Sequence, residues 1–290
     1  MNEIDHDALI VSPQWLAARL GQPGLRIVDC STWMQPNPVG ASTMTSARSH
    51  WAEAHLPGSV HWDLVEDFSA QEACYPFTRP TARELAVLLS RSGIAPDDHV
   101  VLYGARHPNI VSRAWWVLHS MGLRRVSVLD GGLEYWRQLG LPLDAEVVSR
   151  PVTEWREEDF TPVCHADAAA VQRAMAGEAL LVNALSAAQF SGDVSAPHYG
   201  RPGRIPGSIS LPSAAMHDEG RFLAPEDLRQ LAIAAGVPAD PDTPIITYCG
   251  GGLAAATVYL CLLRAGWRQL RLYDNSLLEW SADPSLPMIC

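Results

Sequence analysis

The feature that most constrains the fold is an internal repeat in the chain of 290 residues. The apolar run at 100–104 (VVLYG) matches the run at 245–249 (IITYC), and a helical pattern follows each of them. A glycine, a short strand-like run and an aspartate then follow in both halves. Short β-branched runs that alternate with helices are typical of a mainly parallel sheet covered by helices. We therefore predict an α/β protein in which one unit occurs twice.

The two copies set the expected domain bounds. A second pair of matching segments, 55–60 (HLPGSV) and 204–209 (RIPGSI), lies upstream of the first pair. We predict one domain over residues 8–148 and a second over residues 160–290. The polar stretch 149–162, with its proline and glutamate residues, is the expected linker. The chain length suits two domains that each bury a core.

Composition and charge exclude several classes of function. Hydrophobic residues make up 48% and charged residues 18%, as in a globular protein. The net charge of −11 disfavours nucleic acid and anionic membrane surfaces as partners. All 21 basic residues are arginine. Schiff-base chemistry, pyridoxal phosphate anchoring and P-loop phosphate binding all need a lysine, so we exclude them.

The cysteines and the chain start favour an intracellular protein. The six cysteines have no paired spacing, which favours free thiols in a reducing compartment over disulfides or a zinc site. We expect no metal and no organic cofactor. Residues 1–7 are acidic and lack the apolar core of a secretory signal. No stretch has the apolar length of a membrane span. We therefore expect a cytoplasmic protein.

One cysteine stands out because of the residues around it. Cys249 follows the strand-like run Ile245–Tyr248, and Gly250–Gly252 separate it from the helical pattern that begins at Leu253. Glycines let successive N–H groups turn inward into an anion-binding nest, to which the helix N-terminus adds its dipole. We expect Cys249 to exist there largely as the nucleophilic thiolate. The alternative is a buried structural cysteine beside a tight turn.

The first copy lacks this nucleophile. Gly104 stands at the position of Cys249, and its loop contains Pro108, which removes one N–H group from any nest. We expect the first domain to be catalytically inactive and to close over the loop of the second, excluding water.

These motifs together resemble the tandem-domain sulfurtransferases of the rhodanese family, which act on thiosulfate or 3-mercaptopyruvate. The resemblance covers nearly the whole chain and is carried by the segments 55–58, 203–207, 249–254, 273–276 and 279–280. It implies two rhodanese-like domains with the site between them. It also implies that Cys249 takes a sulfane sulfur as a persulfide and passes it to cyanide or a thiol. In such a cycle the backbone N–H groups of the loop would cradle the persulfide, and these belong to Gly250, Gly251, Gly252, Leu253 and Ala254.

The chain departs from the family at the position that binds the donor. An Asp-x-Arg often ends the strand that opens the catalytic domain, and its arginine binds the anionic donor. Here the segment is Asn183-Ala184-Leu185, without an arginine. We expect Arg201 and Arg204 to supply the missing positive charge, although both could instead be solvated surface residues. The choice between thiosulfate and 3-mercaptopyruvate stays open.

Two other functions are compatible with parts of this pattern. Phosphatases of the same fold close a longer loop with an arginine six residues after the cysteine, where this chain has Ala255. Phosphate hydrolysis is therefore disfavoured. A persulfide carrier with little turnover is the main alternative, favoured by the loss of the arginine at Leu185. In either case we expect small-molecule donors and acceptors, and a monomer or a weak homodimer.

Overall fold

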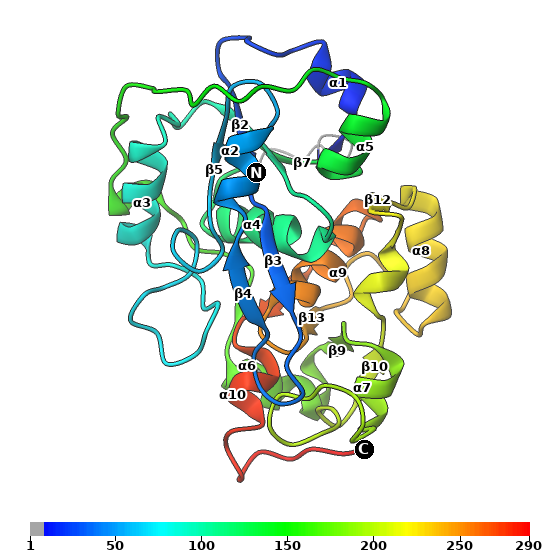
Figure 1. Cartoon of the computed structure of the whole chain (residues 1–290). Coiled ribbons are helices and arrows are strands. Elements are labelled where there is room, and N and C mark those ends of the chain that lie inside the picture. The colour runs from blue at the N-terminus through cyan, green and yellow to red at the C-terminus, as the bar shows by residue number, and fades with distance from the viewer. Residues whose placement is uncertain (1–8) are drawn as a thin grey trace.

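The computed structural model describes residues 9–290 and contains two five-stranded parallel sheets, one in each half of the chain (Figure 1). Two predictions lie outside the described residues. They are the absence of a secretory signal in the acidic stretch 1–7 and the start of the first domain at residue 8. The predicted α/β class with two tandem domains is confirmed.

The two sheets share one strand order, which is the structural form of the sequence repeat. The first runs β1-β7-β6-β2-β5, and the second runs β8-β14-β13-β9-β10. The first sheet comprises β1 (Ile10–Val11), β2 (Leu25–Asp29), β5 (Ser59–His61), β6 (His99–Tyr103) and β7 (Val126–Leu129). The second comprises β8 (His165–Ala166), β9 (Leu180–Asn183), β10 (Ser208–Ser210), β13 (Ile245–Tyr248) and β14 (Leu270–Tyr273).

Two short antiparallel hairpins lie outside the sheets, one in each domain. They are β3 (Thr32–Gln35) with β4 (Thr43–Ser46), and β11 (His217–Asp218) with β12 (Arg221–Phe222). The first of them extends from the first domain toward the second (Figure 1).

The repeated Pro-Gly turns are held by a repeated tyrosine. The Tyr103 hydroxyl accepts the N–H of Leu56, and the Tyr248 hydroxyl accepts the N–H of Ile205. Each hydroxyl also shares a hydrogen bond with the serine that follows the turn. The matching tyrosines at the ends of β6 and β13 therefore have the same structural role in both domains.

Helices cover the sheets, and two of them meet between the domains. In the first domain they are α1 (Pro13–Ala17), α2 (Arg48–Glu53), α3 (Ala82–Arg91), α4 (Pro108–Ser120) and α5 (Gly132–Gln138). In the second they are α6 (Ala168–Arg173), α7 (Ala187–Ser191), α8 (Pro225–Ala234), α9 (Leu253–Arg264) and α10 (Ser276–Trp280), with short turns η3 (Ala174–Glu178) and η4 (Ser213–Met216).

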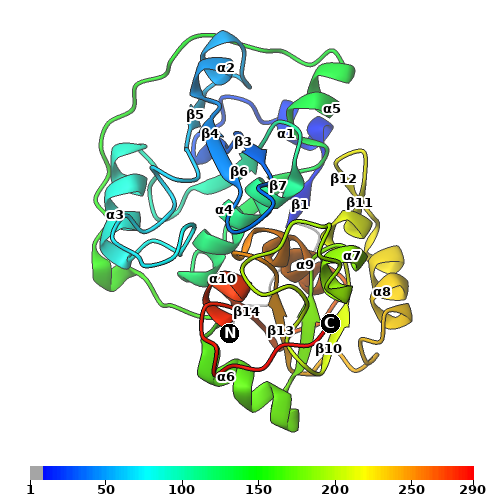
Figure 2. The ribbon, with the colours of Figure 1, turned by 60° about the horizontal axis from the view of Figure 1, so that its bottom comes forward.

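The predicted linker crosses the outside of the first domain (Figure 2). It contains the short turn η2 (Glu157–Asp159) and is bonded to the domain it leaves. Thr153 Oγ1 and Trp155 Nε1 both donate to the carbonyl of Ile94, at 2.7 and 2.6 Å. The stretch is therefore packed against the first domain, although its polar composition is typical of an exposed connection.

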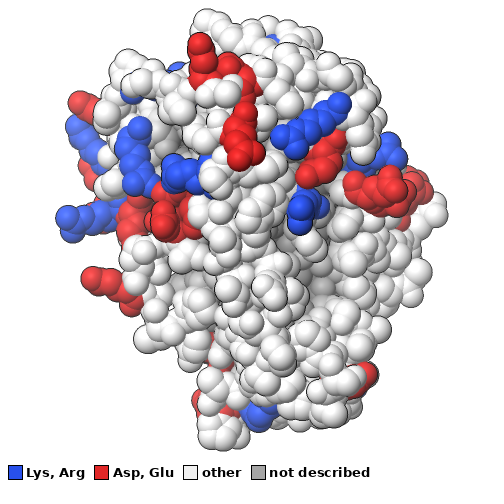
Figure 3. All heavy atoms as spheres, in the orientation of Figure 1, with Lys and Arg blue, Asp and Glu red and all other residues white. Residues whose placement is uncertain are grey.

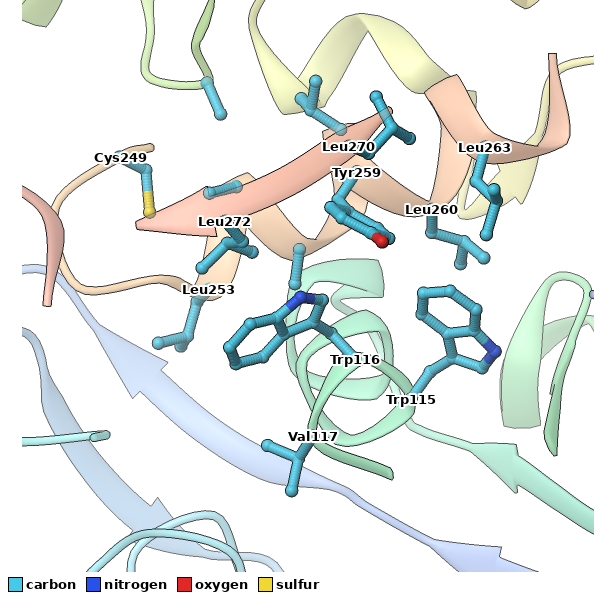
Figure 4. Close-up of a cluster of buried hydrophobic side chains, with 14 of the residues drawn as sticks. Trp115, Trp116, Val117, Cys249, Leu253, Tyr259, Leu260, Leu263, Leu270 and Leu272 are labelled. Carbon is cyan, nitrogen blue, oxygen red and sulfur yellow. The ribbon is translucent and has the colours of Figure 1, made fainter. Parts of the chain in front are cut away.

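The largest apolar core continues from one domain into the other through α4 and α9. Every residue of α4 is buried, and α9 is buried at nearly every position. Trp115 and Trp116 project from α4 toward Tyr259 and Leu260 of α9 (Figure 4). Burial of apolar surface on this scale is the main force that holds two domains in one arrangement.

Candidate functional site between the domains

Cys249 lies directly after β13, at the carboxyl edge of the second sheet, and only 2% of its surface is exposed. Its N–H donates to Ser276 Oγ at 3.0 Å, and its carbonyl accepts the N–H of Leu277 at 3.1 Å. The next carbonyl, of Gly250, accepts the N–H of Leu278 at 2.9 Å. The first turn of α10 therefore fixes the backbone of the cysteine.

The amides that follow Cys249 have no partner within the protein. In the described part of the chain, the N–H groups of Gly250 through Ala254 donate to no backbone or side-chain acceptor. Leu253 and Ala254 begin α9, whose first N–H groups have no acceptor in the helix. Free donors at a helix N-terminus form a site for negative charge. The predicted loop thus has the hydrogen-bonding capacity of an anion nest.

Close packing explains why this loop contains only glycine between the cysteine and the helix. A Cβ on Gly250 would overlap the ring of Tyr199. Gly252 has φ of +82° and lies against the carbonyl of Asp274, where a Cβ would come within 2.6 Å of that oxygen. A side chain at either position would displace the loop or its neighbours.

The first domain supports the loop through a buried arginine. The side chain of Arg113, from α4, is fully buried and pairs with Asp274 at 2.6 Å. It also donates to the carbonyl of Phe77 and lies over the ring of Trp116. The second Asp274 oxygen accepts the N–H of Arg79 at 2.8 Å. Because Asp274 lies against Gly252, these contacts join the first domain to the far side of the loop.

A cavity of about 200 Å³ opens beside Cys249 and is shared by both domains. The first domain contributes the β3–β4 hairpin, with Met34 and Met44, together with Phe77 and Asn109. The second domain contributes Cys249 and its loop, Tyr199, and the segment 184–186 after β9. Residues of both domains therefore line the space beside Cys249.

The hairpin tip is bonded to the second domain and forms a roof over the cavity. Gly40 N–H donates to the carbonyl of His198 at 2.7 Å, and His198 N–H donates to the carbonyl of Pro38 at 3.0 Å. The neighbouring Tyr199 packs against Gly250, and burial raises the pKa of its hydroxyl to about 12. Tyr199 is therefore neutral at physiological pH and acts there as a packing group.

The structure does not bring the two predicted arginines to the cavity. The guanidinium of Arg201 donates to four carbonyls of the C-terminal segment, those of Trp280, Ser281, Asp283 and Leu286. Arg204 donates to the carbonyl of Phe190 at 3.1 Å and lies over its ring. Neither lines the cavity with Cys249 and Leu253. The expected contact of these arginines with a donor has no support in this geometry.

Arg113 and the β3–β4 hairpin are parts of the site that sequence reasoning missed. Arg113 is the one charged residue in the largely apolar stretch 110–118, which is a signal of a buried ion pair. The hairpin carries no such signal. Its Met34 and Met44 are ordinary in composition, and only the folded chain places them opposite Cys249.

Comparison with known proteins agrees with this arrangement. The model of the rhodanese-like domain matches residues 12–139 and again residues 168–283. The chain belongs to the rhodanese-like family. It is 31% identical over 280 residues to the 3-mercaptopyruvate sulfurtransferase of Escherichia coli K12, covering 96% of both chains. It is 35% identical to a probable 3-mercaptopyruvate sulfurtransferase of Pseudomonas aeruginosa, covering 97% of this chain and 98% of the relative.

Solved structures are similar to this chain over its whole fold. The crystal structure of SseA from Escherichia coli, a 3-mercaptopyruvate sulfotransferase with the rhodanese fold, superposes with a TM-score of 0.81 and 28% identity. That match covers 92% of this chain and 98% of SseA. Tum1 from Saccharomyces cerevisiae shares the fold with a TM-score of 0.81 at 22% identity, over 95% of each chain. The family and its relatives identify this member as a sulfurtransferase.

The remaining features concern metals and membranes. Residues 9–290 contain no cluster of three or more His, Cys, Asp or Glu side chains that could hold a metal ion. Within the same residues, no helix combines the length and the apolar character needed to cross a bilayer.

Proposed function

We propose that Cys249 is the nucleophile of a two-step sulfur transfer and that thiosulfate or 3-mercaptopyruvate is the donor. With 3-mercaptopyruvate the thiolate attacks the donor sulfur, so an S–S bond forms and the C–S bond breaks. The electron pair passes to the carbon, which takes the thiol proton and leaves as pyruvate. With thiosulfate the leaving group is sulfite. Both donors leave Cys249 as a persulfide.

An acceptor then removes the outer sulfur. Cyanide attacks it, the S–S bond breaks, thiocyanate leaves and the Cys249 thiolate returns; a thiol acceptor leaves as its own persulfide. The negative charge of the enzyme persulfide would be stabilised by the free N–H groups of Gly250–Ala254. The observation that carries the proposal is this row of unpaired donors beside Cys249 in a cavity. No cofactor takes part in the cycle.

The first domain, over residues 8–148, is proposed to be inactive and to serve the second, over residues 160–290. Gly104 directly follows β6 as Cys249 directly follows β13, so the first domain offers no nucleophile at this position. It supplies the hairpin roof and the buried Arg113 instead. A roof that excludes water protects a persulfide from side reactions.

The relatives support turnover with 3-mercaptopyruvate. That donor gives its name to the matched proteins of Escherichia coli, Pseudomonas aeruginosa and humans. A persulfide carrier with little turnover is the second candidate. It is favoured by Leu185, which stands in the cavity where the family often has a donor-binding arginine.

The decisive experiment measures thiocyanate formed from each donor and cyanide, with Cys249→Ser as the control variant. We expect turnover by the wild-type protein and at least a thousandfold loss in the variant, since a hydroxyl at that position is a far weaker nucleophile. Intact-protein mass spectrometry should show one added sulfur atom on the wild type alone. Loading without turnover would favour the carrier. Loading of Cys249→Ser, or no loading from either donor, would contradict the proposal.

We further propose that the protein works in the cytoplasm as a monomer or weak homodimer. Among the described residues all six cysteines are free, and a persulfide cycle needs a thiol that is not lost to disulfides. Gel filtration at two protein concentrations tests the oligomeric state.

A further inference from the structure

The cavity beside Cys249 is lined by no positively charged side chain that could pair with an anionic donor. None of the residues that line it is arginine, lysine, histidine, aspartate or glutamate. Its ionisable members are Cys249 itself and Tyr199, whose hydroxyl stays neutral. In the proposed cycle the free N–H groups of Gly250–Ala254 hold the charge of the Cys249 persulfide.

Two arginines near the site, Arg201 in the sequence and Arg113 in space, are bonded to other groups of the protein. Arg201 is held by four backbone carbonyls of the C-terminal segment. Arg113 is fully buried and paired with Asp274. Each guanidinium already has partners, and moving it toward the cavity would break the four hydrogen bonds of Arg201 or leave the buried carboxylate of Asp274 without its ion pair.

Leu185 occupies the position from which a side chain could supply the missing charge. It follows β9, which pairs with β13 so that Asn183 lies opposite Tyr248. The N–H of Ala184 donates to the carbonyl of Tyr248 at 2.9 Å. This register places the segment beside Cys249, and Leu185 lines the cavity while only 6% of its surface is exposed.

The rest of the cavity wall is uncharged, partly apolar and partly made of neutral polar side chains such as Asn109, Ser186 and Gln189. Its apolar part includes Met34 and Met44 of the hairpin, together with Phe77 and Leu253. On the face of the molecule shown in Figure 3, charged side chains gather over the upper part, and the lower central part is largely uncharged. An unpaired carboxylate or sulfonate carried into such a cavity loses its hydration without gaining an ion pair.

We propose that this site takes sulfur from an uncharged α-mercaptoketone in preference to an anionic donor, and that Leu185 sets this selectivity. The inference rests on the proposed function, because it uses the same Cys249 persulfide. The thiolate attacks the sulfur of HS–CH₂–CO–R, the S–S bond forms and the C–S bond breaks. The electron pair goes to the carbon, which takes the thiol proton and leaves as the methyl ketone CH₃–CO–R. No further reactant is needed.

The first test compares 3-mercaptopyruvate with its methyl ester, which has the same reacting bonds but no charge. Thiocyanate formation with cyanide as acceptor gives kcat/KM for each donor. We expect the wild-type kcat/KM for the ester to exceed that for the acid by about tenfold or more. This ratio corresponds to the free energy lost when a charged group lacks one hydrogen bond. Equal values, or a preference for the acid, would overturn the proposal.

The second test changes the residue. Leu185→Arg should raise the ratio of kcat/KM for 3-mercaptopyruvate to kcat/KM for the ester by about tenfold to a hundredfold. Leu185→Met keeps the volume without the charge and should change the donor ratio little. A rise that is equal for both donors, or one that also occurs in Leu185→Met, would overturn the role of Leu185.

The outcomes separate this proposal from the one it rests on. If Cys249 accepts sulfur from the acid better than from the ester, sulfur transfer stands and the selectivity is wrong. If neither donor loads sulfur onto the wild-type protein, both proposals fail. If Leu185→Arg does not fold, the wild-type ratio of ester to acid still decides the donor class, and Leu185→Lys repeats the charge test.

Discussion

At the scale of single residues, the loop after β13 is shaped by what packs against each glycine. Gly250 leaves room for the ring of Tyr199, and Gly252 leaves room for the carbonyl of Asp274. The glycines were expected from the sequence to permit backbone curvature. The structure adds a second reason, which is that the neighbouring groups occupy the space of a Cβ.

Gly250→Ala tests this packing. The new methyl group would meet the Tyr199 ring, so we expect a loss of about 1–3 kcal/mol in the free energy of unfolding and a fall in sulfur-transfer rate. Denaturant titration and the thiocyanate assay measure the two effects. In the double variant with Tyr199→Ala the clash is absent, and the two substitutions should show a favourable coupling energy. If the effects of the two substitutions on the free energy of unfolding simply add, contact with the Tyr199 ring is not the cause of the destabilisation.

At the scale of secondary structure elements, α4 and α9 carry the interface between the domains. Both are buried over nearly their whole length and carry apolar side chains on all sides, as is typical of helices inside a protein. His119 lies near the end of α4, stacked on Trp115, and its Nε2 approaches the hydroxyl of Tyr259 in α9 at 3.5 Å. A histidine buried at this contact has consequences for stability.

Burial, aided by the charge of Arg124, lowers the pKa of His119 from 6.5 to about 4. The unfolded chain therefore binds more protons than the folded chain between these two values. The stability that depends on neutral His119 is complete above pH 6.5 and is lost as the pH falls toward 4.

We therefore expect His119→Gln to have a flatter dependence of unfolding free energy on pH than the wild type. The difference in slope should reach about 1.4 kcal/mol per pH unit between pH 6.5 and 4. Urea titrations at several pH values measure it, and carboxylates that titrate in both proteins cancel in the difference. If the unfolding free energies of the two proteins change in parallel between pH 6.5 and 4, His119 takes up its proton in the folded state as readily as in the unfolded state, and the prediction is wrong.

At the scale of the whole molecule, the two domains complete one site. Arg113 and Asp274 belong to different domains, and their side chains are 0% and 4% exposed. Asn109 of α4 accepts a hydrogen bond from Thr257 of α9 at 2.8 Å, which adds a second polar link across the interface. A buried ion pair of this kind adds little net stability, but loss of one partner leaves an uncompensated charge.

Arg113→Met should therefore destabilise the protein by about 3–5 kcal/mol and reduce the sulfur-transfer rate, because Asp274 beside Gly252 loses its partner. The double variant with Asp274→Asn should recover part of the stability, since no carboxylate remains to be neutralised. Denaturant titration of both variants measures the coupling energy. If the loss of unfolding free energy in the double variant equals the sum of the losses in the two single variants, the broken ion pair does not cause the instability of Arg113→Met.

Much of the architecture could be predicted from the sequence because its signals are local. The run before Cys249, the three glycines and the following apolar helix are contiguous, so their order alone predicted a strand, a nest and a helix. The repeat of that order around Gly104 predicted a sheet in the first domain as well, and the two sheets have the same strand order.

The positions of the charges were decided only by the tertiary structure. Arg201 lies a few residues from the Pro-Gly turn at 206–207, yet its partners are about 80 residues away, at the C-terminus. Arg79 and Asp274 meet across 195 residues of sequence. Such contacts depend on how the two domains dock, which no local pattern encodes. The sequence by itself determined Cys249 and the glycine loop after it, whereas docking placed Arg113 behind that loop and left the cavity before it without a cation.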